Sequence, residues 1–444
     1  MVFLLTFFIA NVHAKEFSQQ PNKVYIDYCG TLDKKYTEYI LTDDIFAQGD
    51  CFVINSSNVI LNFNGNKIIG NSLSGKGVKI SEAKSVSVIN GEIISFPRGV
   101  ELIDSKFVTI QDVNFSFFGN PSEEIYGIYL ANVSYSILRG NSIISEESID
   151  YGVYFEESSW NLVIDNFIYW MAYRGIYLDE LSSPNSFISN TFLDNDEGIV
   201  SDSPDNLFIN NYFQGHDSTA LYIRGDRNIL KNNDFYLNNE ASVFYFSDDN
   251  RVINSSFFEN WNSIAIVSSY GIDFSDSNII GSQRDAIRLV SFQGIVGRIN
   301  FRNILVNNTN KNYYDLNIYG NEIEDIYFSD SLIGSYNLGS GIERLSFKNS
   351  LFGRIKFLEK VHGEGKNFDK DIIFTQNKVL INSSLNQGLD KKSEVELFNL
   401  IFSNEPSEID IFRDGKLCIE CNLIYFDGAK IEFEAPGKGI YSII

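Results

Sequence analysis

The chain has 444 residues, of which 44% are hydrophobic, and it carries a formal net charge of −23 at pH 7 with a sequence pI near 4.5. A chain of this length and apolar content can bury one long core. The negative charge argues against nucleic acid as a partner, because such binding depends on Lys and Arg that neutralise phosphates, and it repels anionic polysaccharide unless calcium bridges the charges.

Residues 1–14 are predicted to be a secretory signal peptide. An apolar run ends in Val12-His13-Ala14, which fits the small-residue cleavage site of such peptides, although the usual basic residues at the start are missing. No later run reaches the roughly 18 apolar residues of a membrane span. We therefore predict a protein that is secreted or held at the cell surface, without a lasting transmembrane anchor.

Two pairs of cysteines lie near the two ends of the chain. Cys29 and Cys51 bracket a predicted N-terminal cap, residues 15–50, and Cys418 and Cys421 lie in a Cys-Ile-Glu-Cys turn near the C-terminus. An even number of cysteines placed in this way predicts two local disulfides formed in an oxidising compartment. For the second pair, free thiols and half of a zinc site are the alternatives, but no second pair of ligands lies nearby.

A four-residue motif, which we call the phrase, recurs ten times between Gly77 and Ala286. It consists of a small, an aliphatic, a variable and an aliphatic residue. Successive copies start 21 to 28 residues apart, which is the period of a solenoid whose units bury their apolar faces against each other. The alternation within the phrase predicts a strand. Two further apolar groups follow each copy, so three short strands and three turns fill the period and leave no room for a helix. We therefore predict an all-β fold, a single-stranded parallel β-helix of about 12 coils, over residues 51–392.

The turns of these coils are predicted to depend on glycine and asparagine. The glycine that opens most copies of the phrase is expected to take a positive φ at a sharp bend. Two files of asparagine recur every 21 to 25 residues, and we expect them to tolerate left-handed turn positions and to bond the same residue one coil away. Both files are interpreted as structural ladders. Their members are Asn141, Asn166, Asn190, Asn211 and Asn233 in the first file, and Asn161, Asn185, Asn206, Asn228 and Asn250 in the second.

The repeat loosens after about residue 310 and then changes character. Residues 372–374 and 378–381 are expected to form one more pair of coil strands. From about Val395 onward, short alternating runs are separated by Gly-containing turns, which is typical of hairpins. Residues 393–444 are therefore predicted to form a small antiparallel β cap.

The phrases SNVILN at residues 57–62 and GNKIIG at residues 65–70 precede the Gly-Ile-x-Leu and Asn-Asn-x-Phe repeats. Together they resemble the right-handed parallel β-helix repeats of the NosD-like family, within a larger group of carbohydrate-binding proteins and sugar hydrolases. The cysteine-containing start is similar to that of secreted, often archaeal, members. The resemblance covers roughly residues 25–360 and implies a right-handed β-helix, but it implies no single activity, since the fold hosts lyases, hydrolases, epimerases and inert stalks.

The family name suggests copper handling, which the composition does not favour. Besides the four cysteines, the chain after residue 14 offers only His216, His362 and Met171 as ligands for copper. No metal site and no cofactor is therefore assigned. Calcium is the one cation that the acidic turns of the chain could take.

The variable residue of the phrase should project outward from its strand, where a ligand can reach it. This residue is Tyr129, Tyr154 and Tyr177 in three consecutive copies and Tyr222 two copies later, and Phe244 is expected to project in the same way. Flat aromatic faces suit the apolar faces of sugar rings, so the four tyrosines are predicted to bind glycan. The alternative is stacking for packing alone, since Tyr has a high β propensity.

Acidic residues follow two of the tyrosine strands: Glu156 and Glu157 in one turn, and Asp179 and Glu180 in the next. Carboxylates on adjacent coils are candidates for the general acid and base of glycoside hydrolysis or for calcium ligands. The alternative is a solvated acidic face. The motif orders of polygalacturonases and alginate epimerases are both missing.

These observations favour a non-catalytic β-helix protein, secreted or at the cell surface, that binds polysaccharide or another component of the cell envelope. A calcium-assisted polysaccharide lyase or glycoside hydrolase centred on the four acids is the first alternative. A purely structural envelope spacer is the second.

Overall fold

The computed structural model describes residues 20–71, 74–117, 124–145, 149–307, 310, 312–382, 387–402 and 409–444. The predicted signal peptide lies outside these residues. Contacts divide the chain into two compact units, residues 1–239 and 240–444, which we describe separately as unit 1 and unit 2. No helix in the described part of the chain combines the length and the apolar character needed to cross a membrane.

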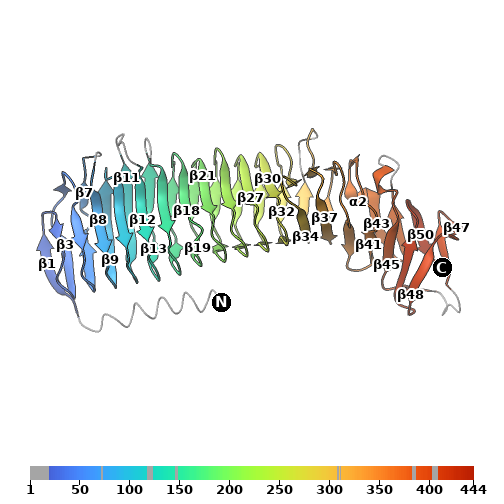
Figure 1. Cartoon of the computed structure of the whole chain (residues 1–444), viewed down its shortest axis with the longest axis horizontal. Coiled ribbons are helices and arrows are strands. Elements are labelled where there is room, and N and C mark those ends of the chain that lie inside the picture. The colour runs from blue at the N-terminus through green and yellow to red at the C-terminus, as the bar shows by residue number, and fades with distance from the viewer. Residues whose placement is uncertain are drawn as a thin grey trace. The chain divides into compact units, whose positions relative to one another are not determined.

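Unit 1 is a parallel β-helix with three rows of strands (Figure 1). Within each row, a strand pairs in parallel with the strand one coil away. The strands that carry the repeated phrase form one row, which we call the phrase sheet. Its members in unit 1 are β2 (Gly30–Thr31), β5 (Phe52–Ile54), β8 (Lys76–Ser81), β10 (Arg98–Ile103), β12 (Tyr126–Ala131), β15 (Tyr151–Glu156), β18 (Arg174–Leu178), β21 (Glu197–Ser201) and β24 (Thr219–Ile223).

Two further rows complete the coils of unit 1. The strands β9 (Val86–Ile94) and β11 (Thr109–Phe117) extend through both rows, because each pairs with two shorter strands of a neighbouring coil. One row otherwise contains β1 (Asn22–Ile26), β3 (Thr37–Leu41), β6 (Val59–Asn62), β13 (Ile137–Arg139), β16 (Leu162–Ile164), β19 (Ser186–Ile188), β22 (Leu207–Ile209) and β25 (Ile229–Lys231). The other contains β4 (Ile45–Phe46), β7 (Lys67–Ile69), β14 (Ser142–Ser145), β17 (Phe167–Tyr169), β20 (Thr191–Leu193), β23 (Tyr212–Gln214) and β26 (Asp234–Tyr236).

The interior of unit 1 is filled by side chains that stack from coil to coil. Phe187 stacks on Phe208 with ring centroids 5.1 Å apart, and Phe213 stacks between Phe192 and Phe235 at 4.9 Å from each. All five rings are buried. This spacing is close to the distance of about 4.8 Å between hydrogen-bonded strands, so backbone pairing and ring stacking reinforce each other. The predicted parallel β-helix is confirmed.

Close approach of neighbouring coils explains the glycine of the phrase. Gly152 has no positive φ, and a Cβ built on it would lie 2.5 Å from the carbonyl oxygen of Gly175 and 3.0 Å from Cγ2 of Ile168. Gly127 is crowded in the same way, with a carbonyl oxygen 2.6 Å from its would-be Cβ. The expected positive φ at this position is therefore wrong. Glycine is needed at these two positions because a Cβ there would lie too close to the next coil.

Gly152→Ala is expected to destabilise the protein by about 2 kcal/mol, because the added methyl group must push the next coil away or distort the strand. Gly49→Ala is the matched control, since a Cβ at Gly49 meets nothing within 4 Å and its φ is not positive. Urea unfolding of both variants, followed by circular dichroism, measures the difference. Equal stability of the two variants would show that the coils have room for a side chain here.

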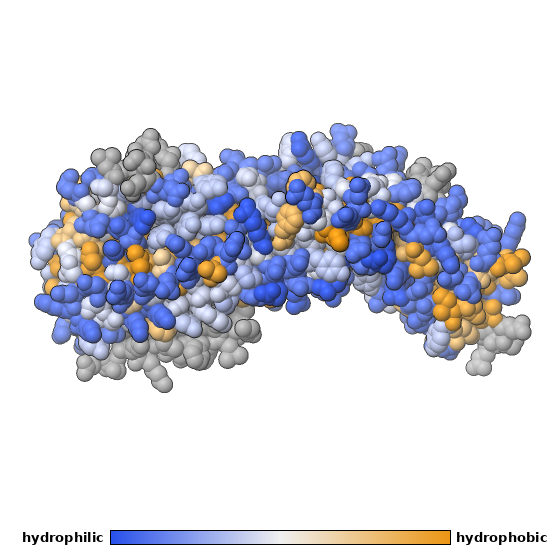
Figure 2. All heavy atoms as spheres, in the orientation of Figure 1, coloured by the Kyte–Doolittle hydropathy of each residue, from blue (hydrophilic) through white to orange (hydrophobic). Residues whose placement is uncertain are grey.

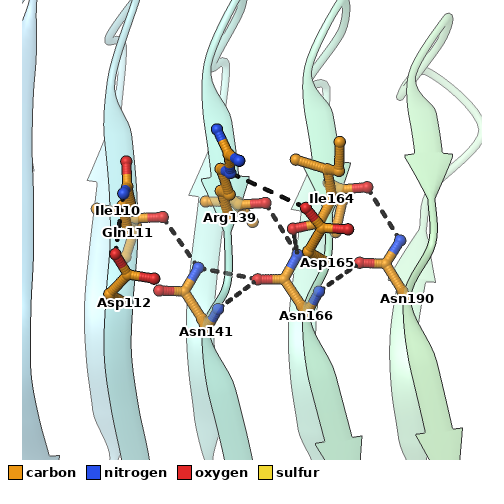
Figure 3. Close-up of polar contacts among 11 residues, drawn as sticks. Ile110, Gln111, Asp112, Arg139, Asn141, Ile164, Asp165, Asn166 and Asn190 are labelled. Atoms are coloured by element: carbon orange, nitrogen blue, oxygen red, sulfur yellow. Dashed lines mark hydrogen bonds and ion pairs between the residues drawn. The ribbon is translucent and has the colours of Figure 1, made fainter.

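Buried asparagines join the turns of neighbouring coils. Nδ2 of Asn141 donates to Oδ1 of Asn166 at 2.9 Å, and Nδ2 of Asn166 donates to Oδ1 of Asn190 at 3.0 Å (Figure 3). Each acceptor oxygen also receives the backbone N–H of the preceding ladder residue. The predicted ladder is confirmed, but the left-handed backbone belongs to the residue before each asparagine, as in Gly140 (φ 61°) and Asp165 (φ 57°).

A third ladder, which sequence reasoning missed, accompanies the two expected ones. In the second file the N–H of Asn161 donates to Oδ1 of Asn185 at 2.9 Å. In the third, the N–H of Asn195 donates to Nδ1 of His216 at 3.2 Å, and the N–H of His216 donates to Oδ1 of Asn238 at 3.2 Å. The ladders pair buried backbone groups that would otherwise lie at the turns without partners.

Unit 2 also contains parallel coils. Phe274, Phe301, Phe328 and Phe347 stack in sequence, with successive centroids 5.4, 5.0 and 5.3 Å apart. Its phrase-sheet strands are β27 (Glu240–Tyr245), β30 (Asn262–Val267), β33 (Ile287–Val290), β36 (Leu316–Tyr319) and β39 (Tyr336–Asn337). The other rows contain β28 (Arg251–Ile253), β31 (Asp273–Ser275), β34 (Val296–Arg302), β37 (Ile323–Ser329) and β40 (Ser346–Asn349), and β29 (Ser256–Phe258), β32 (Asn278–Ile280), β35 (Leu305–Asn307) and β38 (Leu332–Ile333).

The pairing in unit 2 changes from parallel to antiparallel after β40. The sheet continues from β40 through β41 (Gly353–Phe357), β45 (Ser393–Leu397), β49 (Ile431–Ala435) and β48 (Asn422–Phe426), all antiparallel. A second antiparallel sheet contains β43 (Ile372–Thr375), β44 (Lys378–Ile381), β50 (Gly439–Ile443), β46 (Ile411–Arg413) and β47 (Lys416–Leu417). Short elements between them are β42 (Glu364–Gly365), α2 (Phe368–Asp371) and η1 (Gln387–Leu389).

The antiparallel C-terminal sheet is thus present as predicted, but one expectation about the coils is wrong. β43 and β44 do not form coil strands. They form a hairpin, because Asn377 takes a left-handed φ of 57° and the chain reverses between Thr375 and Lys378.

Both predicted disulfides are present, Cys29–Cys51 in unit 1 and Cys418–Cys421 in unit 2. The second one closes a short loop in which Ile419 is 91% exposed. Other apolar side chains of this region, on β47 and β48, are also exposed. Figure 2 shows them as a hydrophobic patch over the C-terminal strands.

Candidate binding face

Three of the predicted tyrosines lie side by side on the outer face of the phrase sheet. Tyr129 of β12 pairs in register with Tyr154 of β15, which pairs with Tyr177 of β18. The ring centroids are 5.6 Å apart in the first pair and 5.0 Å apart in the second. The rings are half-buried and inclined to one another by 32° and 53°, so each ring covers part of the next.

A second file of side chains, which sequence reasoning missed, lies beside this ladder. Arg98, Tyr126, Tyr151 and Arg174 pair in register on consecutive strands. Tyr126 and Tyr151 stack with centroids 5.3 Å apart, and both rings meet Tyr154 edge to face. The glycine and the aliphatic residue that follow each member are both buried. The residue before the glycine and the variable residue therefore lie on the same side of the sheet, but the rings of Tyr126 and Tyr151 are covered by their neighbours and only 7% and 8% exposed. The signal in the sequence is the aromatic or basic residue before each glycine.

Together these side chains make one aromatic surface, which we call the tyrosine face. Tyr173 lies at its edge, 40% exposed, with its ring centroid 5.5 Å from that of Tyr151. The members of the tyrosine face are Tyr126, Tyr129, Tyr151, Tyr154, Tyr173 and Tyr177.

Carboxylates accept hydrogen bonds from three hydroxyl groups of the tyrosine face. Burial raises the pKa of each of these phenols, and the neighbouring carboxylate raises it further. All three therefore remain protonated hydrogen-bond donors. The pairs are Tyr126 with Glu124, Tyr129 with Glu156, and Tyr177 with Asp202, the last at 2.8 Å.

Tyr154 differs from these three. Its hydroxyl group has no hydrogen-bond partner among the residues that the structure describes, although its ring contacts those of Tyr126, Tyr129, Tyr151 and Tyr177. Burial raises the pKa of this phenol as well. The centre of the tyrosine face therefore carries a protonated hydroxyl that is available to a ligand.

Two arginines lie over rings at opposite ends of the tyrosine face, where a cation is attracted by the aromatic quadrupole. Burial lowers the pKa of the Arg174 guanidinium, but the hydrogen bond and the charge of Glu197 raise it overall, so the group stays charged. The distances from guanidinium carbon to ring centre are 4.8 Å for Arg98–Tyr129, 5.5 Å for Arg98–Tyr126, 4.2 Å for Arg174–Tyr173 and 4.6 Å for Arg174–Tyr177.

The fourth predicted tyrosine, Tyr222, is separated from the other three. The outward residue of the intervening strand β21 is Val200, which pairs with Tyr177 on one side and with Tyr222 on the other. The guanidinium carbon of Arg224 lies 5.0 Å from the centre of the Tyr222 ring. Tyr222 therefore shares the sheet with the tyrosine face, but an aliphatic residue lies between them.

Phe244 does not project outward as expected. It is fully buried and meets Phe274 edge to face in the core of unit 2. In β27 the phrase begins at Ala241 and not, as expected, at Ser242. Its variable, outward residue is therefore Val243, which pairs with Ala265, the variable residue of the next strand. Two small residues stand next to each other, at 241 and 242, and made the register ambiguous.

The acidic candidates lie in the turns that follow β15 and β18. Glu156 accepts the hydroxyl group of Tyr129. The carboxylate of Asp179 accepts the N–H of Glu157 at 3.1 Å and, from its own turn, the N–H of residue 181 at 3.2 Å and the hydroxyl of residue 182 at 2.6 Å. Glu157 takes a left-handed φ of 48°, and Glu180 is exposed. Two of the four carboxylates thus hold parts of the protein in place.

Comparison with known proteins gives a match to one family model over part of the chain. Residues 42–222 match the family model described as periplasmic copper-binding protein (NosD). No curated protein matches the chain. Similar solved structures include the periplasmic alginate epimerase AlgG (12% identity, 71% of this chain and 76% of that chain, TM-score 0.41), an exopolygalacturonase from Thermotoga maritima (11%, 82% and 100%, 0.40) and a variant tailspike protein of E. coli bacteriophage HK620 (10%, 99% and 88%, 0.46).

The described residues do not fit a copper site. Met171 and His216 lie two coils apart, since the N–H of Met171 bonds Asn195 and the N–H of Asn195 bonds His216. The four cysteines are paired in disulfides. Among the described residues, the one group of three potential ligands consists of carboxylates that already form ion pairs with Arg354 and Lys430: Glu394, Glu396 and Glu432.

The match to the family model coincides with the parallel coils of unit 1. The matched residues contain copies of the repeated phrase, stacked phenylalanines such as Phe187 and Phe208, and ladder asparagines such as Asn141 and Asn166, and all three features continue beyond residue 222. Over residues 42–222 the chain is thus a parallel β-helix that matches the NosD family model.

Proposed function

We propose that the tyrosine face binds a polysaccharide, without catalysis, outside the cell or at its surface. The observation that carries this proposal is the gathering of four accessible tyrosines and two arginines on consecutive coils, above the two buried rings of Tyr126 and Tyr151. Tyr and Arg, together with Trp, are enriched among the residues that contribute most to binding at protein–protein interfaces. Tyr supplies a large amphipathic contact area while losing little conformational entropy.

The groups on the tyrosine face suit a sugar chain. The hydroxyl of Tyr154 can donate to a sugar hydroxyl, and the exposed ring of Tyr173 can pack against the apolar face of a sugar ring. The carboxylates of Glu124 and Glu156 can accept hydrogen bonds from sugar hydroxyls. Because the coils repeat, an extended glycan would meet similar groups at successive coils.

The hydrogen bonds of the acids favour binding over chemistry. Glu156 is engaged by the hydroxyl of Tyr129. Asp179 accepts two hydrogen bonds from its own turn and one from the N–H of Glu157 in the neighbouring coil. Two disulfides favour an oxidising compartment outside the cytosol, where polysaccharide is available.

Tyr154→Ala is expected to weaken polysaccharide binding at least about tenfold, since an aromatic contact and a hydrogen bond are lost together. The matched control is Tyr25→Ala, which removes a tyrosine that is 66% exposed on β1. The purified chain and both variants would be screened against neutral and acidic polysaccharides, with and without calcium, for binding and for release of new reducing ends. Near-ultraviolet circular dichroism checks that the variants are folded.

Each outcome of this screen decides the proposal. Binding that Tyr154→Ala loses and Tyr25→Ala retains supports it. If the unaltered chain neither binds any polysaccharide nor releases reducing ends from one, the proposal is overturned in favour of a structural role. New reducing ends that disappear in Glu156→Gln or Asp179→Asn overturn it in favour of a lyase or hydrolase.

A further inference from the structure

Three cations surround one buried carboxylate at the β8–β10 end of the tyrosine face. Glu101 is 2% exposed although it belongs to the outward file of the phrase sheet. Its Oε2 lies 3.7 Å from Nζ of Lys76 and 3.9 Å from Nζ of Lys79, and its Oε1 is ion-paired with Arg98. A buried charge needs such partners, because burial without them is strongly unfavourable.

Glu101 does not balance the charge around it. Three positive groups and one negative group leave a local charge of +2. Within the described part of the chain, none of the three cations forms an ion pair with any other residue. Their side chains are 27%, 33% and 36% exposed, so they remain within reach of a ligand. We call Lys76, Lys79 and Arg98 the cationic cluster.

The other arginines near the tyrosine face are compensated one to one. Arg174 pairs with Glu197 at 2.7 Å, and Arg224 pairs with Asp202 at 3.2 Å. The excess of positive charge therefore lies at one end of the face, in a chain whose net charge is −23. At physiological ionic strength the screening length is about 8 Å, so a group bound at this end responds to the cationic cluster more than to distant acids.

The cationic cluster and the tyrosine face are continuous. Lys79, Glu101 and Tyr129 pair in register on β8, β10 and β12. The guanidinium carbon of Arg98 lies 4.8 Å from the centre of the Tyr129 ring. A ligand that lies across the tyrosines would thus reach the cations without crossing another surface.

We infer that the glycan bound by the tyrosine face carries acidic oxyanion groups, carboxylate or sulfate, and that one of these groups lies on the cationic cluster. This inference rests on the proposed function and specifies its substrate class. The net negative charge of the chain is expected to repel an anionic glycan, but the cationic cluster would attract it at the binding site itself.

Matched pairs of polymers test the inference: polygalacturonate against its methyl ester, and dextran sulfate against dextran. Binding to the full chain would be measured by titration calorimetry in 0.15 M salt with a chelator, so that calcium cannot bridge acidic groups. At least one charged polymer is expected to bind about tenfold more tightly than its neutral twin. Lys79→Gln should weaken binding of that charged polymer about fivefold and leave the neutral twin unaffected. Lys79→Arg should restore binding, and Lys106→Gln, which removes an exposed lysine elsewhere, should change nothing.

The outcomes separate this inference from the proposed function. Tighter binding of either charged polymer, lost in Lys79→Gln and kept in Lys79→Arg, supports both. Equal binding of charged and neutral twins, or indifference to Lys79→Gln, overturns the inference while leaving glycan binding intact. Failure of all four polymers to bind overturns both.

Discussion

Asn166→Leu is expected to lower the free energy of unfolding by about 4 kcal/mol, because it leaves several buried polar groups without partners. Nδ2 of Asn166 donates to the carbonyl oxygens of Leu138 and Ile164 and to Oδ1 of Asn190. Its Oδ1 accepts both the N–H and the Nδ2 group of Asn141. Leucine has a similar size but cannot replace any of these bonds, and each unsatisfied buried group costs about 1–3 kcal/mol.

The matched control for this prediction is Asn114→Leu, the same chemical change at an exposed position of β11. It should alter stability by no more than about 0.5 kcal/mol. Urea unfolding gives the overall change. Because a solenoid can open locally, hydrogen exchange at the backbone amides of Asn141 and Asn166 gives the local one. A loss no larger than that of Asn114→Leu would show that the ladder bonds add little to stability.

His216 is expected to make the protein lose stability as the pH falls from about 6.5 to about 4. Burial lowers the pKa of His216 to about 4, whereas an unfolded chain has a histidine pKa of about 6.5. Between these values the unfolded state binds a proton that the folded state does not, so acid favours unfolding. The stability that neutral His216 contributes is fully present above pH 6.5, and about 3 kcal/mol of it is lost by pH 4.

The substitution that tests this is His216→Asn, because asparagine occupies the same ladder position one coil away on each side, at Asn195 and Asn238. The free energy of unfolding would be measured for both proteins between pH 4.5 and pH 7.5. Carboxylate titration is common to both and cancels in the difference. The variant should lose less stability on acidification than the unaltered chain. Identical pH dependence would mean that His216 takes up a proton equally well in the folded state.

The coils could be predicted from sequence because their determinants are periodic. Inward residues recur at a fixed place in each coil, and ladder asparagines bond their own equivalents, as Asn141 and Asn166 do. The predictions that were wrong concern features that depend on the distance between coils or on the conformation of a single turn residue. The need for glycine at position 152 comes from a neighbouring carbonyl oxygen 2.5 Å away, which no single copy of the phrase reveals. The hairpin of β43 and β44 depends on one left-handed residue, Asn377.

The binding face could be predicted only in part for a related reason. Tyr129, Tyr154 and Tyr177 occupy the alternating position of the phrase, so simple strand geometry finds them. Tyr126 and Tyr151 escape this reasoning because two successive residues after them are buried, which breaks the alternation. The cationic cluster could not be predicted from the sequence either, because the cations of β8 and β10 meet at Glu101 only when these two strands pair in register.

The change from parallel to antiparallel pairing at β40 and β41 also limits how copies of this chain can associate. A parallel coil ends in an open edge that another parallel coil can extend, and such head-to-tail addition does not close, so it would produce filaments. In an antiparallel ladder the hydrogen bonds come in alternately close and wide pairs, unlike the evenly spaced bonds of a parallel one. The C-terminal sheet therefore presents an antiparallel edge that does not match the parallel pairing of the first coil, and this mismatch disfavours head-to-tail addition of copies.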